Sequence, residues 1–205
     1  MKKEYKRILL GMLALLVVVL IIVLGRRFII LTSLRNKVKE YSSITNYYIS
    51  AIEKNENYTM KVSYYHKDGK VLTRIVREEA DKVTTLEFLD GKVYQTTKTI
   101  STGVEEKKVG EISNPGEGIN LADFNFLETD STWDFIKNIF TTSVIYIDDS
   151  WRIEGYKTAE GKVKPDRMDI NPETGFIDKI YEGTKVTSYD ININKVTDDM
   201  IKIEE

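Results

Sequence analysis

An apolar run from Ile8 to Leu24 is the feature that most constrains this chain of 205 residues. It holds no charged or strongly polar side chain, and basic residues lie on both sides of it. As an α-helix the run spans about 25 Å, which approaches the thickness of the hydrocarbon core of a bilayer. It is also longer than the apolar core of a cleavable signal peptide. We therefore expect a transmembrane helix.

The alternatives to a permanent anchor are a cleaved signal peptide, a lipoprotein leader and a buried helix. The run ends in Gly25-Arg26-Arg27 without a small-x-small cleavage site, and an arginine pair disfavours cleavage there. The chain contains no cysteine, which excludes lipid attachment to a cysteine, disulfides, thiolate metal sites and a cysteine nucleophile. A cleaved signal stays the main alternative to the anchor.

The order of the segments predicts an orientation. A short basic start is typical of an export signal, and long following domains are translocated largely regardless of their charge. We expect residues 1–7 to be a cytoplasmic basic tail and 8–25 to be the anchor in the cell membrane. Residues 26–56 are expected to form a linking and covering helix that continues from the anchor, and 57–205 an extracytoplasmic β domain.

Charge is distributed unevenly along the chain. Residues 1–27 hold six of the 30 basic residues and one of the 32 acidic residues, which leaves 24 basic and 31 acidic residues in 28–205. A domain with this balance is a poor candidate for nucleic acid, because the phosphate backbone is bound by clustered lysine and arginine. We therefore expect a soluble domain with no nucleic-acid partner.

Two periodicities divide the rest of the chain. Between residues 28 and 56, apolar residues recur at steps of three, four or seven, which predicts a helix. From Tyr58 the period changes to two, as in a half-buried strand. Turns that contain glycine then separate strands expected over 58–66, 82–89, 92–100, 151–158, 162–170, 176–182 and 185–194. Strands joined by such short turns predict an antiparallel meander.

The middle of the chain interrupts this pattern. Ser113–Asn125 is rich in glycine, proline and asparagine and predicts a loop. A short amphipathic helix is expected over 131–140, with Asp130 or Ser131 as its cap. Its apolar side is formed by Trp133, Ile136, Ile139 and Phe140. The expected fold class is therefore α+β, in which a transmembrane helix precedes a curved antiparallel sheet covered by one long and one short helix.

Three segments near the C-terminus carry a family resemblance. RMDINPETGFIDKIY (Arg167–Tyr181) has the pattern of a strand, a Thr-Gly turn and a strand, and YDININKVTDDMI (Tyr189–Ile201) that of a closing strand. GYKTAEGKVKPDRM (Gly155–Met168) has the pattern of the preceding strand pair. Together they resemble the LolA/LolB-like family of outer-membrane lipoprotein carriers. The resemblance implies a half-open barrel, in which helices line a curved antiparallel sheet.

Within that family, the small size and the lysine- and isoleucine-rich style are most similar to the clostridial GerS-type germination proteins. That resemblance implies a non-enzymatic partner of a peptidoglycan (cortex) amidase, needed for sporulation or germination in a Gram-positive cell. The carrier members of the family imply an alternative, an apolar concave face that binds lipid or the acyl chains of lipoproteins.

The sequence offers little catalytic chemistry. His66 is the only histidine, so a Ser-His-Asp triad or a histidine-based zinc site would have to use it. Its place at a strand end favours a local packing role. The series Asp169-x-Asn171-x-Glu173 weakly resembles a calcium loop, but a hairpin turn explains the same residues. We therefore expect no enzyme activity, no cofactor and no metal.

Aromatic and large aliphatic side chains are the candidate binding residues. Those expected to line the concave face are Tyr64, Phe88, Tyr94, Trp133, Ile136, Phe140 and Trp151. Either they fill a core, or they line an apolar cavity for acyl chains. Our first hypothesis is an anchored protein that binds another envelope protein, the second is a lipid or lipoprotein carrier or sensor, and the third is an enzyme.

Overall fold

The computed structural model describes residues 2–41, 43–54, 56–111, 121–160 and 164–203. It contains a long helix, α1 (Lys2–Glu40), a short helix, α2 (Thr132–Thr141), and two 3-10 helices, η1 (Leu121–Phe124) and η2 (Asp198–Ile201). The strands are β1 (Asn46–Lys54), β2 (Tyr58–Lys67), β3 (Lys70–Glu79), β4 (Lys82–Leu89), β5 (Lys92–Thr99), β6 (Glu105–Glu111), β7 (Ser143–Ile147), β8 (Ser150–Glu154), β9 (Arg167–Ile170), β10 (Ile177–Glu182) and β11 (Lys185–Ile193). These elements confirm an α+β fold with a long apolar N-terminal helix.

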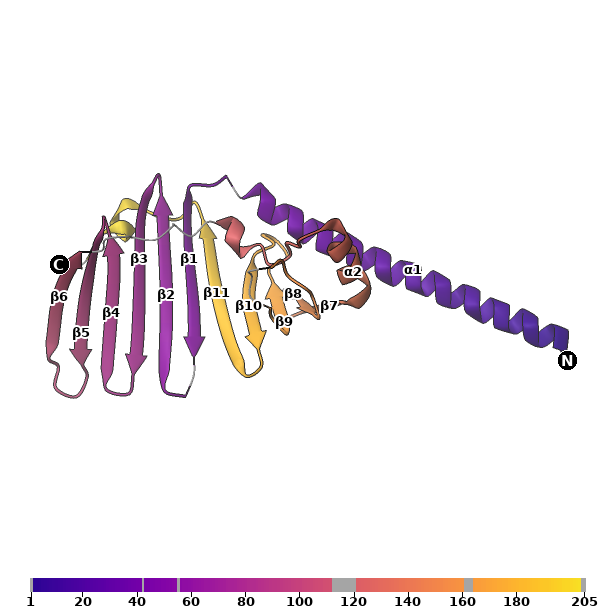
Figure 1. Ribbon diagram of the computed structural model, residues 1–205, viewed down its shortest axis with the longest axis horizontal. Coiled ribbons are helices and arrows are strands. Elements are labelled where there is room, and N and C mark those ends of the chain that lie inside the picture. Colours follow the sequence, from indigo (N-terminus) through magenta and orange to yellow (C-terminus); the bar gives the residue numbers. More distant parts are fainter. Residues whose placement is uncertain (1, 42, 55, 112–120, 161–163, 204–205) are drawn as a thin grey trace.

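All eleven strands belong to one antiparallel sheet, in the order β6-β5-β4-β3-β2-β1-β11-β10-β9-β8-β7 (Figure 1). Two meanders, β1–β6 and β7–β11, meet where β1 pairs with β11, for example with Ile49 opposite Ile191. The sheet is open, with β6 and β7 as its two edges. The first strand of the chain therefore lies in the middle of the sheet.

The hairpin turns predicted from Asp-Gly pairs are confirmed. Asp68-Gly69, between β2 and β3, and Asp90-Gly91, between β4 and β5, all have positive φ angles. Such angles suit the two-residue turns that join antiparallel strands. Gly161 and Lys162 of the turn predicted at Ala159–Lys162, and most of the loop predicted at Ser113–Asn125, lie outside the described residues.

The helix predicted over 26–56 is wrong beyond Glu40, where α1 ends. Residues 46–54 form β1 instead, which pairs with β2 on one side and with β11 on the other. The aromatic and β-branched residues Tyr47, Tyr48 and Ile49 favour a strand, and pairing on both sides stabilises it. The β domain therefore begins with β1, ahead of the boundary predicted at residue 57.

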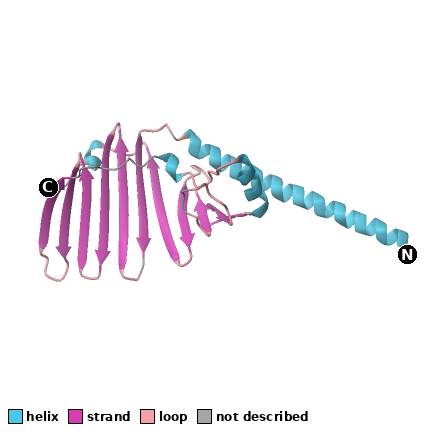
Figure 2. Cartoon of the chain, in the orientation of Figure 1, coloured by secondary structure: helices cyan, strands magenta, loops and turns pink. Residues whose placement is uncertain are grey.

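Helix α1 has an exposed part and a packed part. From Ile8 to Val23 its side chains are exposed, and the helix is long and apolar enough to span a membrane. Farther along, Leu31, Leu34 and Val38 are buried. The N-terminal half of α1 projects away from the sheet (Figure 2). One continuous helix thus runs from the exposed apolar residues into the core of the domain.

The packed part of α1 crosses the sheet from its centre toward β7. Val38 shares a cluster of buried side chains with Tyr47 of β1 and Tyr64 of β2. Leu31 and Leu34, nearer the N-terminus, share a second cluster with side chains of β8, β9 and β10. Helix α1 leaves the domain beside α2, at the β7 end of the sheet (Figure 1). The edge strand β7 is therefore nearest to the apolar run, and β6 is farthest from it.

Gly175, in the turn between β9 and β10, lies against α1. Its φ is +76°, and a Cβ there would collide with the Leu34 carbonyl oxygen and lie 3.1 Å from Val38 Cγ2. We predict that Gly175→Ala lowers the free energy of unfolding by about 2–4 kcal/mol, because backbone strain and collision act together. The control is Gly183→Ala, at φ +58° with open space around it, which should cost about 1 kcal/mol. Urea unfolding of the full chain in detergent micelles measures the free energy of unfolding of both variants. Equal losses would contradict the close contact between Gly175 and α1.

Candidate functional site

The two faces of the sheet have different surroundings. Alternate residues of each strand point to opposite faces. The face on which α1 packs, here called the α1 face, carries Tyr47 and Ile49 of β1, with Tyr64 of β2 opposite Ile49. The other face, here called the far face, is covered at one corner by η2, which contacts β2 and β3.

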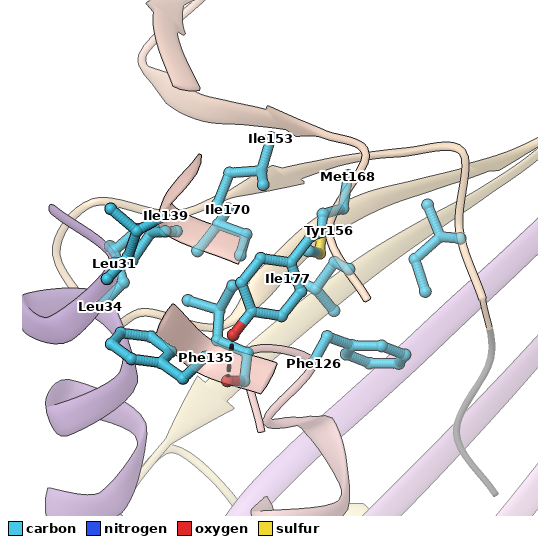
Figure 3. Close-up of a cluster of buried hydrophobic side chains, with 12 residues drawn as sticks. Leu31, Leu34, Phe126, Phe135, Ile139, Ile153, Tyr156, Met168, Ile170 and Ile177 are labelled. Atoms are coloured by element: carbon cyan, nitrogen blue, oxygen red, sulfur yellow. Dashed lines mark hydrogen bonds between the residues drawn. The ribbon is translucent and has the colours of Figure 1, made fainter. Parts of the chain in front are cut away.

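Near β8–β10, the space under the helices is filled by side chains of the protein itself (Figure 3). The buried cluster consists of Leu31, Leu34, Phe126, Leu127, Phe135, Ile139, Ile153, Tyr156, Met168, Ile170, Ile177 and Ile180. Within it, the Tyr156 hydroxyl donates a hydrogen bond to the Leu127 carbonyl oxygen at 2.6 Å. Burial raises the pKa of Tyr156 to about 12, so the hydroxyl stays protonated at neutral pH. A region packed in this way is a core and not a cavity for acyl chains.

The sheet residues predicted to line a concave face have three different surroundings. Tyr64 is buried in the cluster that contains part of α1, and Trp151 is half-buried and packs against the cluster of Figure 3. Phe88 of β4 is half-buried on the α1 face, outside the buried clusters. Tyr94 pairs with Glu87 and therefore points to the far face, away from Phe88. Of the four, Phe88 is the one placed to bind something on the α1 face.

The three residues predicted from α2 lie on the side of the helix that points away from the core. Trp133 and Phe140 are 62% and 61% exposed, and Ile136 is half-buried. The side that packs on the core consists of Phe135, Asn138 and Ile139. Of the predicted apolar side of this helix, only Ile139 is buried. Because α2 carries apolar residues on both sides, spacing alone did not show which side faces the sheet.

Beyond the helices, the α1 face carries an apolar surface, here called the open patch. It is formed by Val62, Ile75, Leu86, Phe88 and Val93, which are half-buried and lie on neighbouring positions of β2–β5. In β4, β5 and β6, which the structure describes in full, the one buried residue is Glu87 on the far face. The open patch is therefore apolar without being part of the core.

Behind the open patch, the far face is polar. Arg74 Nε donates a hydrogen bond to Glu87 Oε1 at 2.7 Å, and the two residues lie directly opposite each other on β3 and β4. The Arg74 guanidinium also lies 5.9 Å from the centre of the Tyr65 ring. This ion pair stabilises the sheet beneath the open patch, and in it the charges of Arg74 and Glu87 are paired with each other.

A second ion pair lies on the far face toward β8. Arg152 donates two hydrogen bonds to the Asp169 carboxylate, at 2.9 and 3.0 Å, and the Tyr181 hydroxyl donates a third at 2.9 Å. Burial alone would raise the pKa of Asp169, but the hydrogen bonds from Arg152 and Tyr181 outweigh it and lower the pKa of the carboxyl. Asp169 is therefore held ionised by its neighbours in a structural role.

The other residues considered for chemistry also have local roles. His66 Nδ1 lies 2.7 Å from the Thr45 carbonyl oxygen, and its ring stacks on Tyr47 with ring centres 4.8 Å apart. Asn171 accepts hydrogen bonds from the amides of Glu173 and Thr174 and so closes the turn that resembles a calcium loop. Among the residues that the structure describes, no group of three or more His, Cys, Asp or Glu side chains could hold a metal ion.

No protein-family model matches this chain, and no curated protein matches it. The resemblance to the LolA/LolB-like family therefore stays a prediction from the C-terminal segments.

Sequence reasoning found one residue of the open patch and missed the rest. It selected aromatic residues, which led to Phe88 but not to Ile75 or Leu86. For Leu86 a signal was present, because Leu86-Glu87-Phe88 alternates between apolar and charged residues, whereas the apolar residues of 71–76 stand in adjacent pairs and do not alternate. Alternation alone does not suffice, because the register between strands decides which residues share a face.

The Asp169 ion pair gives a testable pH dependence. We predict that Asp169→Asn lowers the free energy of unfolding at neutral pH by about 1–3 kcal/mol, because Arg152 loses its charged partner in a partly buried site. Since the folded-state pKa of Asp169 is lowered, its contribution is complete above the unfolded pKa of about 4. The contribution is lost as the pH falls from there through the folded pKa.

Urea unfolding at a series of pH values measures this contribution. The wild type should lose more stability than Asp169→Asn between neutral and acid pH. The control is Asp199→Asn, which removes an exposed partner of Lys202 and should leave the unfolding free energy unchanged. If wild type and Asp169→Asn lost stability in parallel on acidification, Asp169 would not have the role given to it.

Proposed function

We propose that this protein is a single-pass membrane protein whose extracytoplasmic β domain binds another envelope protein and carries out no chemistry itself. The N-terminus lies in the cytoplasm, α1 crosses the cell membrane, and the sheet is a LolA-like scaffold. The partner binds on the open patch of β2–β5.

The observation that carries this proposal is that the described residues place no second layer over one half of the sheet. An antiparallel sheet normally buries one apolar face against another layer. The buried clusters under α1 and α2 include β1, β2 and β8–β10, whereas β4–β6 bury no apolar side chain within the described chain. A partner that covers Leu86, Phe88 and Val93 supplies the missing layer.

A peptidoglycan (cortex) amidase is the partner to test first. This part of the proposal rests on the resemblance of Arg167–Tyr181 and Tyr189–Ile201 to the GerS-type germination proteins. Sporulation and germination are then the setting in which the protein works. A domain held at the membrane by α1 would keep the amidase close to the inner side of the wall.

A lipid or lipoprotein carrier or sensor is the second candidate function. The apolar character of the open patch favours it, because acyl chains also bind apolar surfaces. Two observations favour the protein partner. The space under α1 is filled by the buried cluster of Figure 3, and a helix that spans the membrane would keep a carrier from moving its cargo far.

The proposal predicts that Leu86→Glu weakens binding of the partner about 100-fold, because the complex would bury an unpaired charge at the centre of the interface. The variant should fold, since Leu86 is only half-buried in the free protein. The matched control is Thr96→Glu, on the far face of the neighbouring strand and opposite Lys107, which should bind normally. Biolayer interferometry between the full chain in nanodiscs and a purified amidase measures both affinities.

Photo-crosslinking in cells tests the interface without assuming which protein binds. A benzophenone amino acid in place of Phe88 should form an adduct with an envelope protein, and one in place of Thr96 should not. Native mass spectrometry of the full chain tests the second candidate. Lipid that co-purifies with the wild type and is lost in Leu86→Glu would support the carrier and contradict the protein partner.

A further inference from the structure

The short helix α2 exposes a second apolar side. Its packed side consists of Phe135, Asn138 and Ile139. On the other side, Trp133, Ile136 and Phe140 follow at steps of three and four residues, so they form one stripe along the helix. Trp133 and Phe140 are exposed. The outer side of a surface helix is normally polar, so this apolar stripe indicates a surface that something covers.

The C-terminal end of α2 lies where α1 leaves the domain. Arg27 Nη1 donates hydrogen bonds to the carbonyl oxygens of Ile139 and Phe140, at 3.4 and 3.3 Å. Arg27 follows Leu24 by three residues, or about 5 Å along a helix. Its side chain leans back toward Leu24, because helical side chains point toward the N-terminus of their helix. The headgroup region is about 5–8 Å thick on each side of a bilayer. If Ile8–Leu24 spans the hydrocarbon core, the end of α2 lies at the height of the headgroups.

Exposed apolar side chains also occur on α1, which contacts α2, and on β7, which follows α2 in the chain. Phe28 and Ile29 are exposed on α1 directly after Arg27. The edge strand β7 exposes the consecutive residues Ile145, Tyr146 and Ile147. In contrast, the opposite edge strand, β6, is lined by glutamate and lysine at 105–108. Charges on an edge strand suit an edge that faces water, so the two edges of the sheet are fitted to different surroundings.

We propose that α2 and β7 rest on the same bilayer that α1 spans, with Trp133 and Phe140 at the boundary between headgroups and acyl chains. This inference rests on the membrane anchor of the proposed function. Aromatic side chains favour that boundary because they are amphipathic. Lys137 Nζ lies 5.9 Å from the centre of the Trp133 ring and reaches headgroup phosphates from the same side. Helix α1 holds the domain at the membrane, and the α2 stripe fixes its tilt.

A bilayer fits this surface better than an added protein strand. The surface lies where α1 leaves the domain and includes a helix, which a strand added to the β7 edge would leave uncovered. Acidic groups lie nearby, namely Asp134, which is paired with Lys137, and Asp148-Asp149 in the turn after β7. Docking therefore depends on apolar insertion and not on anionic lipid.

In this orientation the β7 edge of the sheet faces the bilayer, and the β6 edge is farthest from it. Because neighbouring strands lie about 4.8 Å apart, the sheet extends up to about 50 Å from β7 to β6. The open patch on β2–β5 is then held away from the bilayer, on the half of the sheet that a partner in the wall can reach. The open patch and the α2 stripe thus have two different occupants.

Single-tryptophan variants of the full chain test the docking. They are placed in phosphatidylcholine vesicles whose acyl chains carry bromine near the headgroups or, in a second set of vesicles, near the bilayer centre, because bromine quenches tryptophan only at short range. The chain has two tryptophans, so Trp151→Phe leaves Trp133 alone. In a background of Trp133→Phe and Trp151→Phe, Val109→Trp on β6 is the matched control, since Val109 is 67% exposed and Trp133 62%. In the same background, Leu16→Trp reports on the apolar run.

We expect bromine near the headgroups to quench Trp133 roughly twofold or more, because an interfacial apolar face inserts about 5–10 Å. Bromine near the bilayer centre should quench the Leu16→Trp variant, because Leu16 lies at the middle of Ile8–Leu24. The Val109→Trp variant should keep its fluorescence. Quenching of Leu16→Trp without quenching of Trp133 would overturn the docking and leave the anchor intact. No quenching of Leu16→Trp would overturn the anchor itself, and with it the proposed function. A Trp133 that is shielded from acrylamide but not quenched by bromine would also overturn the docking, because a protein would then cover the stripe.

Discussion

The structure depends on the burial of the C-terminal part of α1 against the sheet. Leu31, Leu34 and Val38 are at most 2% exposed, and each fully buried side chain of this kind contributes about 1.5–3 kcal/mol. The same helix carries the exposed apolar run from Ile8. One part of the helix therefore suits a membrane, and the other part suits the core of the domain. A flexible tether would let the domain reorient freely. An unbroken helix instead couples the orientation of the sheet to that of the apolar run.

Helix α1 also divides the sheet into two unequal environments. Toward β7, packed side chains fill the α1 face under the helices, and α2 is joined to α1 through Arg27. Toward β6, the described chain has no helix over the open patch, and Glu87 is the one buried residue of β4–β6. The proposed partner site and the proposed contact with the bilayer follow from this division, because each uses an apolar surface that the protein itself leaves open.

Features that depend on neighbours in the chain were predictable from the sequence. The turn at Asp68-Gly69 is one example, and α2 is another, expected over 131–140 with Ser131 as a possible cap and found from Thr132 with that cap. Strand β1 was missed because it is stabilised by pairing with the distant β11, and a short apolar stretch does not separate a strand from a helix. In the candidate site, Phe88 was predicted but Leu86 was not, since only the register shows which residues share a face.

The central claim is that the apolar run and the sheet form one rigid unit through α1. Pulsed electron paramagnetic resonance tests it most directly, with spin labels on Leu16→Cys and Val109→Cys in the full chain in nanodiscs. The chain has no cysteine of its own, so labels attach at these two positions alone. A single narrow distribution of distances between the labels is the predicted result. A broad distribution, as expected for a domain that swings on a flexible joint, would contradict the claim.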